Sequence, residues 1–120
     1  MAWAVATLAA FDAWFLKLPS RDRAAVMAYL RMLEDRGPTL PHPYSSGIVG
    51  SKHGAMRELR VQSGGRPIRV LYAFDPTRTA IVILGGDKTG DDRWYEVNVP
   101  IADRRYDQHL ASLKPTRPRG

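Results

Sequence analysis

The chain has 120 residues, of which 44% are hydrophobic, and its 18 Lys and Arg against 12 Asp and Glu give a formal net charge of +6. This length fits one domain with one core, and the lack of cysteine excludes disulfides, thiolate nucleophiles and thiolate metal sites. The basic balance favours a polyanionic partner: nucleic acid, an anionic membrane surface or an acidic protein. No apolar run reaches the roughly eighteen residues that span a bilayer and no basic leader is present, so we expect a cytoplasmic protein without a membrane partner.

The N-terminal segment predicts a strand followed by a helix. Trp3, Val5 and Thr7 alternate with alanines, which indicates a short strand that passes into a helix near Leu8. Pro19 ends that helix. Large apolar residues recur at helical spacing, and we expect them in the core: Phe11, Trp14, Phe15 and Leu18.

A second helix is predicted directly after Pro19. Ser20 is its predicted N-cap, and Asp22 falls in the first turn, where the helix macrodipole favours an anion. Gly37 and Pro38 supply the stop. One apolar face is expected to hold Val26, Met27, Leu30 and Leu33.

Residues 38–55 carry prolines and glycines without periodicity and predict a long connecting loop. His42 and His53 lie in it, but without a carboxylate at ligand spacing they indicate no metal site. We interpret His42 as a surface residue. His53 adjoins Lys52 and leads into a strand rich in arginine, so a contact to a substrate is its alternative role.

Residues 56–95 predict three consecutive strands that carry a cluster of basic residues. Gly64 and Gly65 fit a two-residue hairpin turn, because both central positions of such a turn can require positive φ. The resulting register places Arg60 directly opposite Arg69, on the face away from the apolar pairs. Like charges placed opposite each other destabilise a sheet, so this pair points to a function.

The next turn, residues 75–78, fits a four-residue loop built on a type I turn. It would pair Tyr72 with Ile81 and Val70 with Ile83. Two further apolar residues would then lie on the arginine face, Leu71 and Val82. We therefore expect one face to pack on the helices and the other to form a concave, positively charged surface.

The segment 85–96 is rich in glycine but lacks the order of a phosphate-binding P-loop. It brings Lys88, Arg93 and Tyr95 close together in the chain. Its acidic residues fit a solvated loop better than a magnesium site, since no other ligand accompanies them: Asp87, Asp91 and Asp92.

A last amphipathic helix is predicted to begin near Pro100 and to end before Pro115. Residues 1–113 would then form a single domain, and residues 114–120 a disordered basic tail. The apolar face of the helix would hold Ala102, Tyr106, Leu110 and Leu113.

Four runs, MRELR, GGRPIRVLYAFDP, ILGGDKTGDDRWYE and IADRRYDQHL, together resemble HigB-type toxins of the RelE/ParE superfamily, in the branch related to a phage-encoded protein. The resemblance covers most of the chain. It implies an α+β fold with a short first strand, two helices, an antiparallel three-stranded array and a C-terminal helix. The implied function is that of a type II toxin, a ribosome-dependent mRNA endonuclease that inhibits translation and is held inactive by a helix-turn-helix antitoxin.

The resemblance also implies roles for individual residues in a reaction that needs no metal and no cofactor. The ribose 2′-hydroxyl attacks the adjacent phosphate, so the site must stabilise negative charge and transfer protons. Arg60 and Arg69 would hold the scissile phosphate, Lys88 would add positive charge, and Tyr95 would stack on a base or transfer a proton. Further candidates for RNA contacts are Lys52, His53, Arg57, Arg66 and Arg93.

Glu58 departs from the family pattern, because RelE-type enzymes carry a lysine at this position, two residues before the first arginine. The carboxylate is a candidate general base or a salt-bridge partner of Arg60, and we favour the salt bridge. Two other functions stay open: a gyrase-poisoning ParE-like toxin with the same fold, and an RNA-binding or phage regulatory module that does not cleave.

Overall fold

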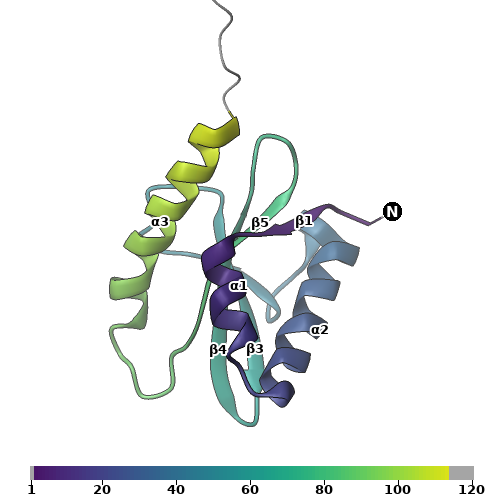
Figure 1. The fold of residues 1–120 in the computed structure, drawn as a ribbon, viewed down its shortest axis with the longest axis vertical. Helices are drawn as coiled ribbons and strands as arrows, with labels where there is room; N and C mark the ends of the chain where they lie inside the picture. The colour runs from purple at the N-terminus through teal and green to yellow at the C-terminus, as the bar shows by residue number, and fades with distance from the viewer. Residues whose placement is uncertain (1, 114–120) are drawn as a thin grey trace, which may run out of the picture.

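The computed structural model describes residues 2–113, which form one five-stranded sheet with helices on both faces (Figure 1). The strand order is β1-β5-β4-β3-β2; β1 runs parallel to β5, and the other neighbours are antiparallel. The elements are β1 (Val5–Thr7), α1 (Ala9–Leu16), α2 (Ser20–Arg36), the 3-10 turn η1 (Gly37–Thr39), β2 (Ser45–Gly47), β3 (Met56–Ser63), β4 (Arg66–Phe74), β5 (Ala80–Asp87) and α3 (Trp94–Leu113).

This architecture confirms the predicted α+β fold, including the passage from strand to helix near Leu8. No helix within residues 2–113 is both long enough and apolar enough to cross a bilayer. The predicted basic tail, residues 114–120, lies outside the described residues.

Both ends of α2 are capped by the backbone of the flanking residues, with no side-chain hydrogen bond. The predicted N-cap is wrong by one position: Pro19 is the N-cap, and its carbonyl accepts the Arg23 amide at 3.0 Å, so Ser20 is already helical. Gly37 ends the helix as predicted, with φ +56°, and the Trp3 ring occupies the space that a side chain there would need.

The apolar face of α2 is narrower than predicted. Val26, Leu30 and Leu33 are buried, but Met27 is 38% exposed. Met27 adjoins Val26 in the chain and so lies about 100° around the helix from it, outside the stripe that contacts the sheet.

The β3–β4 hairpin has the predicted register. Gly64 and Gly65 take φ values of +58° and +76°, as a type I′ turn requires, and Arg60 pairs with Arg69. Both arginines therefore project from the same face of adjacent strands.

The predicted β4–β5 register is wrong. A three-residue loop that ends in Arg78, with φ +66°, replaces the four-residue turn, and a bulge interrupts the ladder at Leu71/Tyr72. Tyr72 consequently pairs with Val82. Val82 was expected on the arginine face, but it faces α1 and α2. Ile81 and Ile83 were expected on the opposite face, but they lie on the arginine face.

Each face of the sheet has its own hydrophobic core. The core beneath α1 and α2 contains Phe11, Val26, Leu30, Leu33, Leu40, Leu59, Val61, Ile68, Val70, Tyr72, Ala80 and Val82, with Trp14, Phe15 and Leu18 packed against it. The core beneath α3 contains Met56, Leu71, Ala73, Ile81, Ile83, Leu84, Trp94, Val99, Ala102 and Tyr106. The arginine face is thus largely covered by α3 (Figure 1), and the expected open basic surface is wrong in extent.

Two boundaries differ from prediction because tertiary contacts decide them. The predicted loop 38–55 contains β2, whose three residues add to the edge of β3 by pairing Ser45 with Leu59. The last helix begins at Trp94, well before Pro100, because the Trp94 side chain is buried on the sheet. The helix runs to Leu113, the last residue that the structure describes.

A buried carboxylate fastens α2 to the β3–β4 hairpin. Asp22 is 1% exposed and accepts hydrogen bonds from Ser63 Oγ at 2.6 Å and from the Arg66 guanidinium at 2.5 and 2.6 Å. Arg66 also donates to Asp87 at 2.6 Å. The Ser63 hydroxyl first, and then Arg66, lower the pKa of Asp22.

Replacing Asp22 by Asn should destabilise the fold in a pH-dependent manner. Because folding lowers the pKa of Asp22, its contribution is present above the unfolded value and is lost as pH falls through the folded value, from about pH 5 downward. Urea denaturation should give D22N a lower midpoint than wild type at pH 7 and a smaller difference at pH 3. D12N, an exposed acid in the first turn of α1, is the control. A difference that does not change with pH would contradict the expectation.

Candidate functional site

The opposed pair Arg60 and Arg69 marks the polar centre of the face that α3 covers. Arg69 is 5% exposed, whereas the Arg60 side chain is 34% exposed and reaches solvent. A buried guanidinium requires hydrogen-bond partners and a counter-charge. The Arg69 guanidinium donates to the Ile68 carbonyl and to the Tyr95 hydroxyl, both at 3.2 Å.

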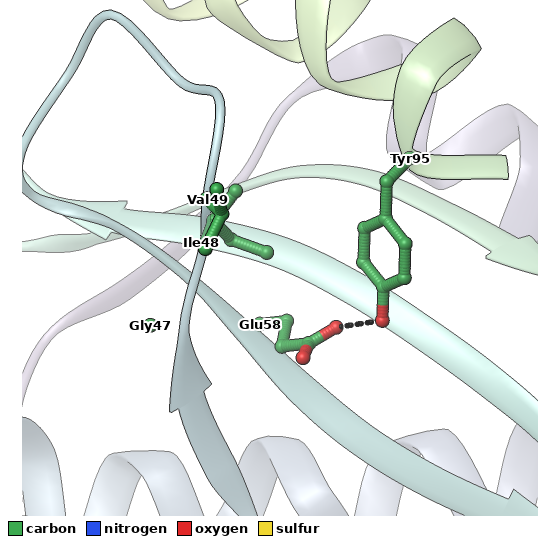
Figure 2. Close-up of a pocket in the computed structure, with 5 residues that line it drawn as sticks. All are labelled: Gly47, Ile48, Val49, Glu58 and Tyr95. Carbon is green, nitrogen blue, oxygen red and sulfur yellow. Dashed lines mark hydrogen bonds between the residues drawn. The ribbon is translucent and has the colours of Figure 1, made fainter. Parts of the chain in front are cut away.

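Glu58 supplies the counter-charge for both arginines. Its carboxylate, on a residue only 4% exposed, accepts a hydrogen bond from Arg60 at 3.2 Å through Oε2, and its Oε1 lies 3.5 Å from Arg69 Nε. Oε1 also accepts the Tyr95 hydroxyl at 2.6 Å (Figure 2). The predicted salt bridge to Arg60 is confirmed, and the carboxylate joins all three side chains.

Tyr95 reaches this carboxylate because of how α3 begins. Trp94 packs against Gly86, where a Cβ would lie 2.6 Å from the indole nitrogen, and Gly86 is the β5 partner of Arg69. The following residue, Tyr95, therefore points from the first turn of α3 toward β3 (Figure 2). Burial first, and then the hydrogen bond to Glu58, raise the pKa of the Tyr95 phenol.

Lys88 completes the group from the loop before α3. Its ammonium lies 5.7 Å from the centre of the Tyr95 ring, and its amide donates to the Pro67 carbonyl at 3.0 Å. The structure thus brings together the four residues that the resemblance named for catalysis, around a fifth whose role was open: Arg60, Arg69, Lys88 and Tyr95, with Glu58.

Each partner of the ion pair between Glu58 and Arg60 lines a cleft of its own. The first, about 340 Å³, is lined by Glu58 and Tyr95 and by the loop residues Gly47, Ile48 and Val49 (Figure 2). The second, about 410 Å³, is lined by Tyr29, Pro43, Tyr44, Arg60, Gln62, Gly65, Pro67 and Arg69. Cationic groups therefore line the second cleft, whereas an acid and a phenol line the first.

Three basic residues predicted to contact RNA have other partners. Arg57 projects from the opposite face, where its Nε donates to Ser45 Oγ at 3.1 Å, next to the Tyr72 hydroxyl of the α1/α2 core. Arg66 is engaged by the two carboxylates that fasten the hairpin, and Arg93 is exposed and paired with Glu96.

Lys52 and His53, the other two residues predicted to contact RNA, both pair with a carboxylate of α3. Lys52 Nζ lies 2.5 Å from Asp107, and His53 Nε2 lies 2.7 Å from the same carboxylate. Lys52 first, and then His53, lower the pKa of Asp107. These contacts fasten the loop that follows β2, whereas His42 is exposed, as predicted.

Sequence reasoning missed Tyr29 and Tyr44 as lining residues of the second cleft. Tyr29 belongs to a helix predicted only by its apolar stripe, and the one signal for Tyr44 was an aromatic residue beside prolines in a long loop. Within residues 2–113, no group of three His, Asp or Glu side chains is arranged to hold a metal ion.

Comparisons with known proteins agree on one group of relatives. Residues 13–107 match the family described as phage-derived Gp49-like protein. Two Mycobacterium tuberculosis proteins, named as candidate toxins HigB3 and HigB2, are 44% and 38% identical over 110 residues. The alignments cover 91% and 90% of this chain; they span 95% of HigB3 but only 55% of HigB2.

A solved structure shows a similar fold. One chain of the RelBE2 toxin–antitoxin complex from Mycobacterium tuberculosis superposes with a TM-score of 0.55 and 19% identity, covering 72% of this chain and 99% of that one. This likeness supports a RelE-like arrangement of strands and helices.

The phenol of Tyr95 should titrate above the usual value of about 10. Subtracting the ultraviolet titration of Y95F from that of wild type isolates this tyrosine among the five. In E58Q the pKa should fall toward 10, since the carboxylate that disfavours the phenolate is removed, but should stay raised because burial persists. A Tyr95 pKa at or below 10 in wild type would contradict the geometry.

Proposed function

The chain belongs to the phage-derived Gp49-like family and to the HigB-type toxins, and on this premise we propose that it is a metal-independent endoribonuclease that cleaves mRNA on the ribosome. It is the toxin of a type II toxin–antitoxin system. The observation that carries the proposed reaction is the opposed pair Arg60 and Arg69, joined to Tyr95 by the buried carboxylate of Glu58.

The reaction places definite demands on such a site. The 2′-oxygen forms a bond to the adjacent phosphorus, the bond from phosphorus to the 5′-oxygen breaks, and a cyclic phosphate and a 5′-hydroxyl result. One proton passes from the 2′-hydroxyl to a base or to solvent water, and one must reach the 5′-oxygen. Negative charge grows on the phosphate oxygens, so donors fixed in advance lower the barrier.

Arg60 and Arg69 suit the charge on the phosphate. Each guanidinium presents several N–H donors in one plane, and the two side chains project side by side from adjacent strands. Arg60 is the accessible member and would meet the phosphate first, while Arg69 is held from behind by the Ile68 carbonyl. Lys88 would add a third positive charge.

Tyr95 suits the transfer of a proton. The phenol is protonated at neutral pH, as any tyrosine with a pKa of about 10 or above is, so it can donate a hydrogen bond to an oxygen on which charge develops. In the free protein the Tyr95 hydroxyl donates this hydrogen bond to Glu58 Oε1. A leaving oxygen that comes within reach of the phenol would accept this hydrogen bond in its place, while Glu58 Oε2 stays bonded to Arg60.

Glu58 acts, in this proposal, as a positioning residue. One carboxylate oxygen accepts from Arg60, and the other accepts from Tyr95 and faces Arg69, so both are already engaged. A general base needs an oxygen that can reach the 2′-hydroxyl. The contribution of Glu58 is to hold two cations and a phenol in one arrangement.

The implied partners are mRNA on the ribosome in the cytoplasm and a cognate antitoxin. The solved relative is described as part of a toxin–antitoxin complex, which supports an antitoxin for this chain as well. We expect it to be a helix-turn-helix protein encoded beside the toxin gene.

Arg60→Ala and Arg69→Ala should abolish growth arrest and message cleavage. Removing one preorganised donor from a charge-stabilising site costs on the order of 10²–10³-fold in rate. Cleavage is measured by mapping 5′ ends of RNA after induction of wild type and each variant. R31A, which removes an exposed arginine from α2, is the control of equal charge change and should cleave as wild type does.

Co-expression of the protein from the adjacent reading frame should relieve the arrest. Unchanged 5′ ends on induction of wild type, or full cleavage by the R60A/R69A double variant, would contradict the nuclease. Arrest with intact messages and broken DNA would favour the gyrase-poisoning alternative.

Glu58→Gln separates a positioning role from that of a base. The amide keeps the size of the side chain but weakens its hold on both arginines, so the single-turnover rate should fall while its pH profile keeps the same shape. A general base would contribute about 10²–10⁴-fold and add a limb to that profile. Loss of that limb in E58Q would overturn the positioning role.

A further inference from the structure

The second cleft contains an aromatic wall that the proposed chemistry does not use. Tyr29, from α2, and Tyr44, from the loop before β2, contact each other with ring centres 6.2 Å apart and planes at 62°. Arg60 and Arg69 line the same cleft. Aromatic rings and guanidinium groups thus share one hollow at the edge of the catalytic group.

Tyr44 is held firmly although its ring is open to solvent. Its carbonyl accepts the Arg60 amide at 2.9 Å, and its amide donates to the Pro41 carbonyl at 3.0 Å. Tyr44 is nevertheless 41% exposed, whereas Tyr29 is partly buried against the α1/α2 core. The hydroxyls of both tyrosines form no hydrogen bond within residues 2–113. The ring of Tyr44 is therefore both fixed in position and accessible to a ligand.

The position of this wall suits a nucleotide that is already held by its phosphate. The backbone hydrogen bond from Arg60 to Tyr44 fixes the ring beside the strand that presents the guanidinium. Gln62, two residues further along β3, is exposed at the rim and offers both donors and an acceptor. Single-stranded RNA is bound in this way: phosphates meet cations while unstacked bases lie on aromatic rings.

We propose that the second cleft is a nucleobase subsite in which a base next to the scissile phosphate stacks on Tyr44, supported by Tyr29, while Gln62 hydrogen-bonds the edge of that base. This inference rests on the proposed function, since it takes the phosphate to lie at Arg60 and Arg69. It assigns the codon preference of the toxin partly to this cleft. An antitoxin segment in the same place is the competing occupant.

The test removes either the base or the ring. Ribosomes are programmed with synthetic mRNAs in which each nucleotide around the cut is replaced, one at a time, by an abasic ribose, and single-turnover cleavage is measured. Binding of the same RNAs without ribosomes is followed by fluorescence anisotropy. The proteins are wild type, Y44L, Y44F and L16A, the last removing an exposed apolar side chain from α1.

One abasic position should cost wild type about tenfold to a hundredfold, the range expected for loss of one stacked base. Y44L should lose a similar factor on intact RNA and nothing more on that abasic RNA, because ring and base act as a pair. Y44F, which keeps the ring, should regain most of the rate that Y44L loses, and L16A should match wild type.

The possible failures are distinguishable. If wild type cleaves and the abasic series is flat, or if Y44L equals wild type, the subsite is wrong and the nuclease stands. If wild type does not cleave but binds RNA in a manner that depends on Tyr44 and one base, the subsite stands and the nuclease falls. Loss of antitoxin affinity alone in Y44L overturns the subsite. Should Y44L fail to fold, the abasic series on wild type decides.

Discussion

The buried carboxylate of Glu58 is the constraint on which the site depends. Two arginines on adjacent strands repel each other, and one of them, Arg69, is almost wholly removed from water. A buried charge without a partner would be strongly destabilising, whereas one anion between two cations offsets both the repulsion and much of the lost hydration. The same carboxylate binds the Tyr95 hydroxyl, so the interaction that permits the arginine pair also orients the phenol.

The pair of glycines at the end of β5 brings the third element to this carboxylate. A side chain on Gly85 would overlap the Trp14 ring of α1, and one on Gly86 would meet the Trp94 ring of α3. Because these two residues have no side chains, a helix can approach this part of β5 closely from each face. Because Gly86 pairs with Arg69, the helix that docks there delivers Tyr95 beside the arginine. The glycines of the segment 85–96 suggest a phosphate-binding loop, but in the structure Gly85 and Gly86 allow helix packing.

The sequence predicts this site well where local chemistry determines geometry. Two adjacent glycines set the β3–β4 turn, and the opposition of Arg60 and Arg69 follows from it. The next register could not be predicted, because a bulge at Leu71/Tyr72 and a left-handed Arg78 carry no reliable local signal. The cover over the arginine face was also missed, because the start of α3 is decided by burial of Trp94. The residues that the resemblance named for catalysis lie together around Glu58. Arg57, which was named for RNA contacts, projects from the other face of the sheet.

The charge balance of the group fits the proposed reaction better than it fits simple binding. Three cations, Arg60, Arg69 and Lys88, against the one carboxylate of Glu58 leave an excess of 3 − 1 = +2. A phosphodiester carries one negative charge, and the phosphorane formed by attack of a deprotonated 2′-oxygen carries two. A site with this excess is matched to the transition state and is over-charged for the ground state, which is the difference that accelerates a reaction. Without Glu58 the excess would be three, held by a less ordered set of side chains. The carboxylate thus adjusts the charge of the site as well as its geometry.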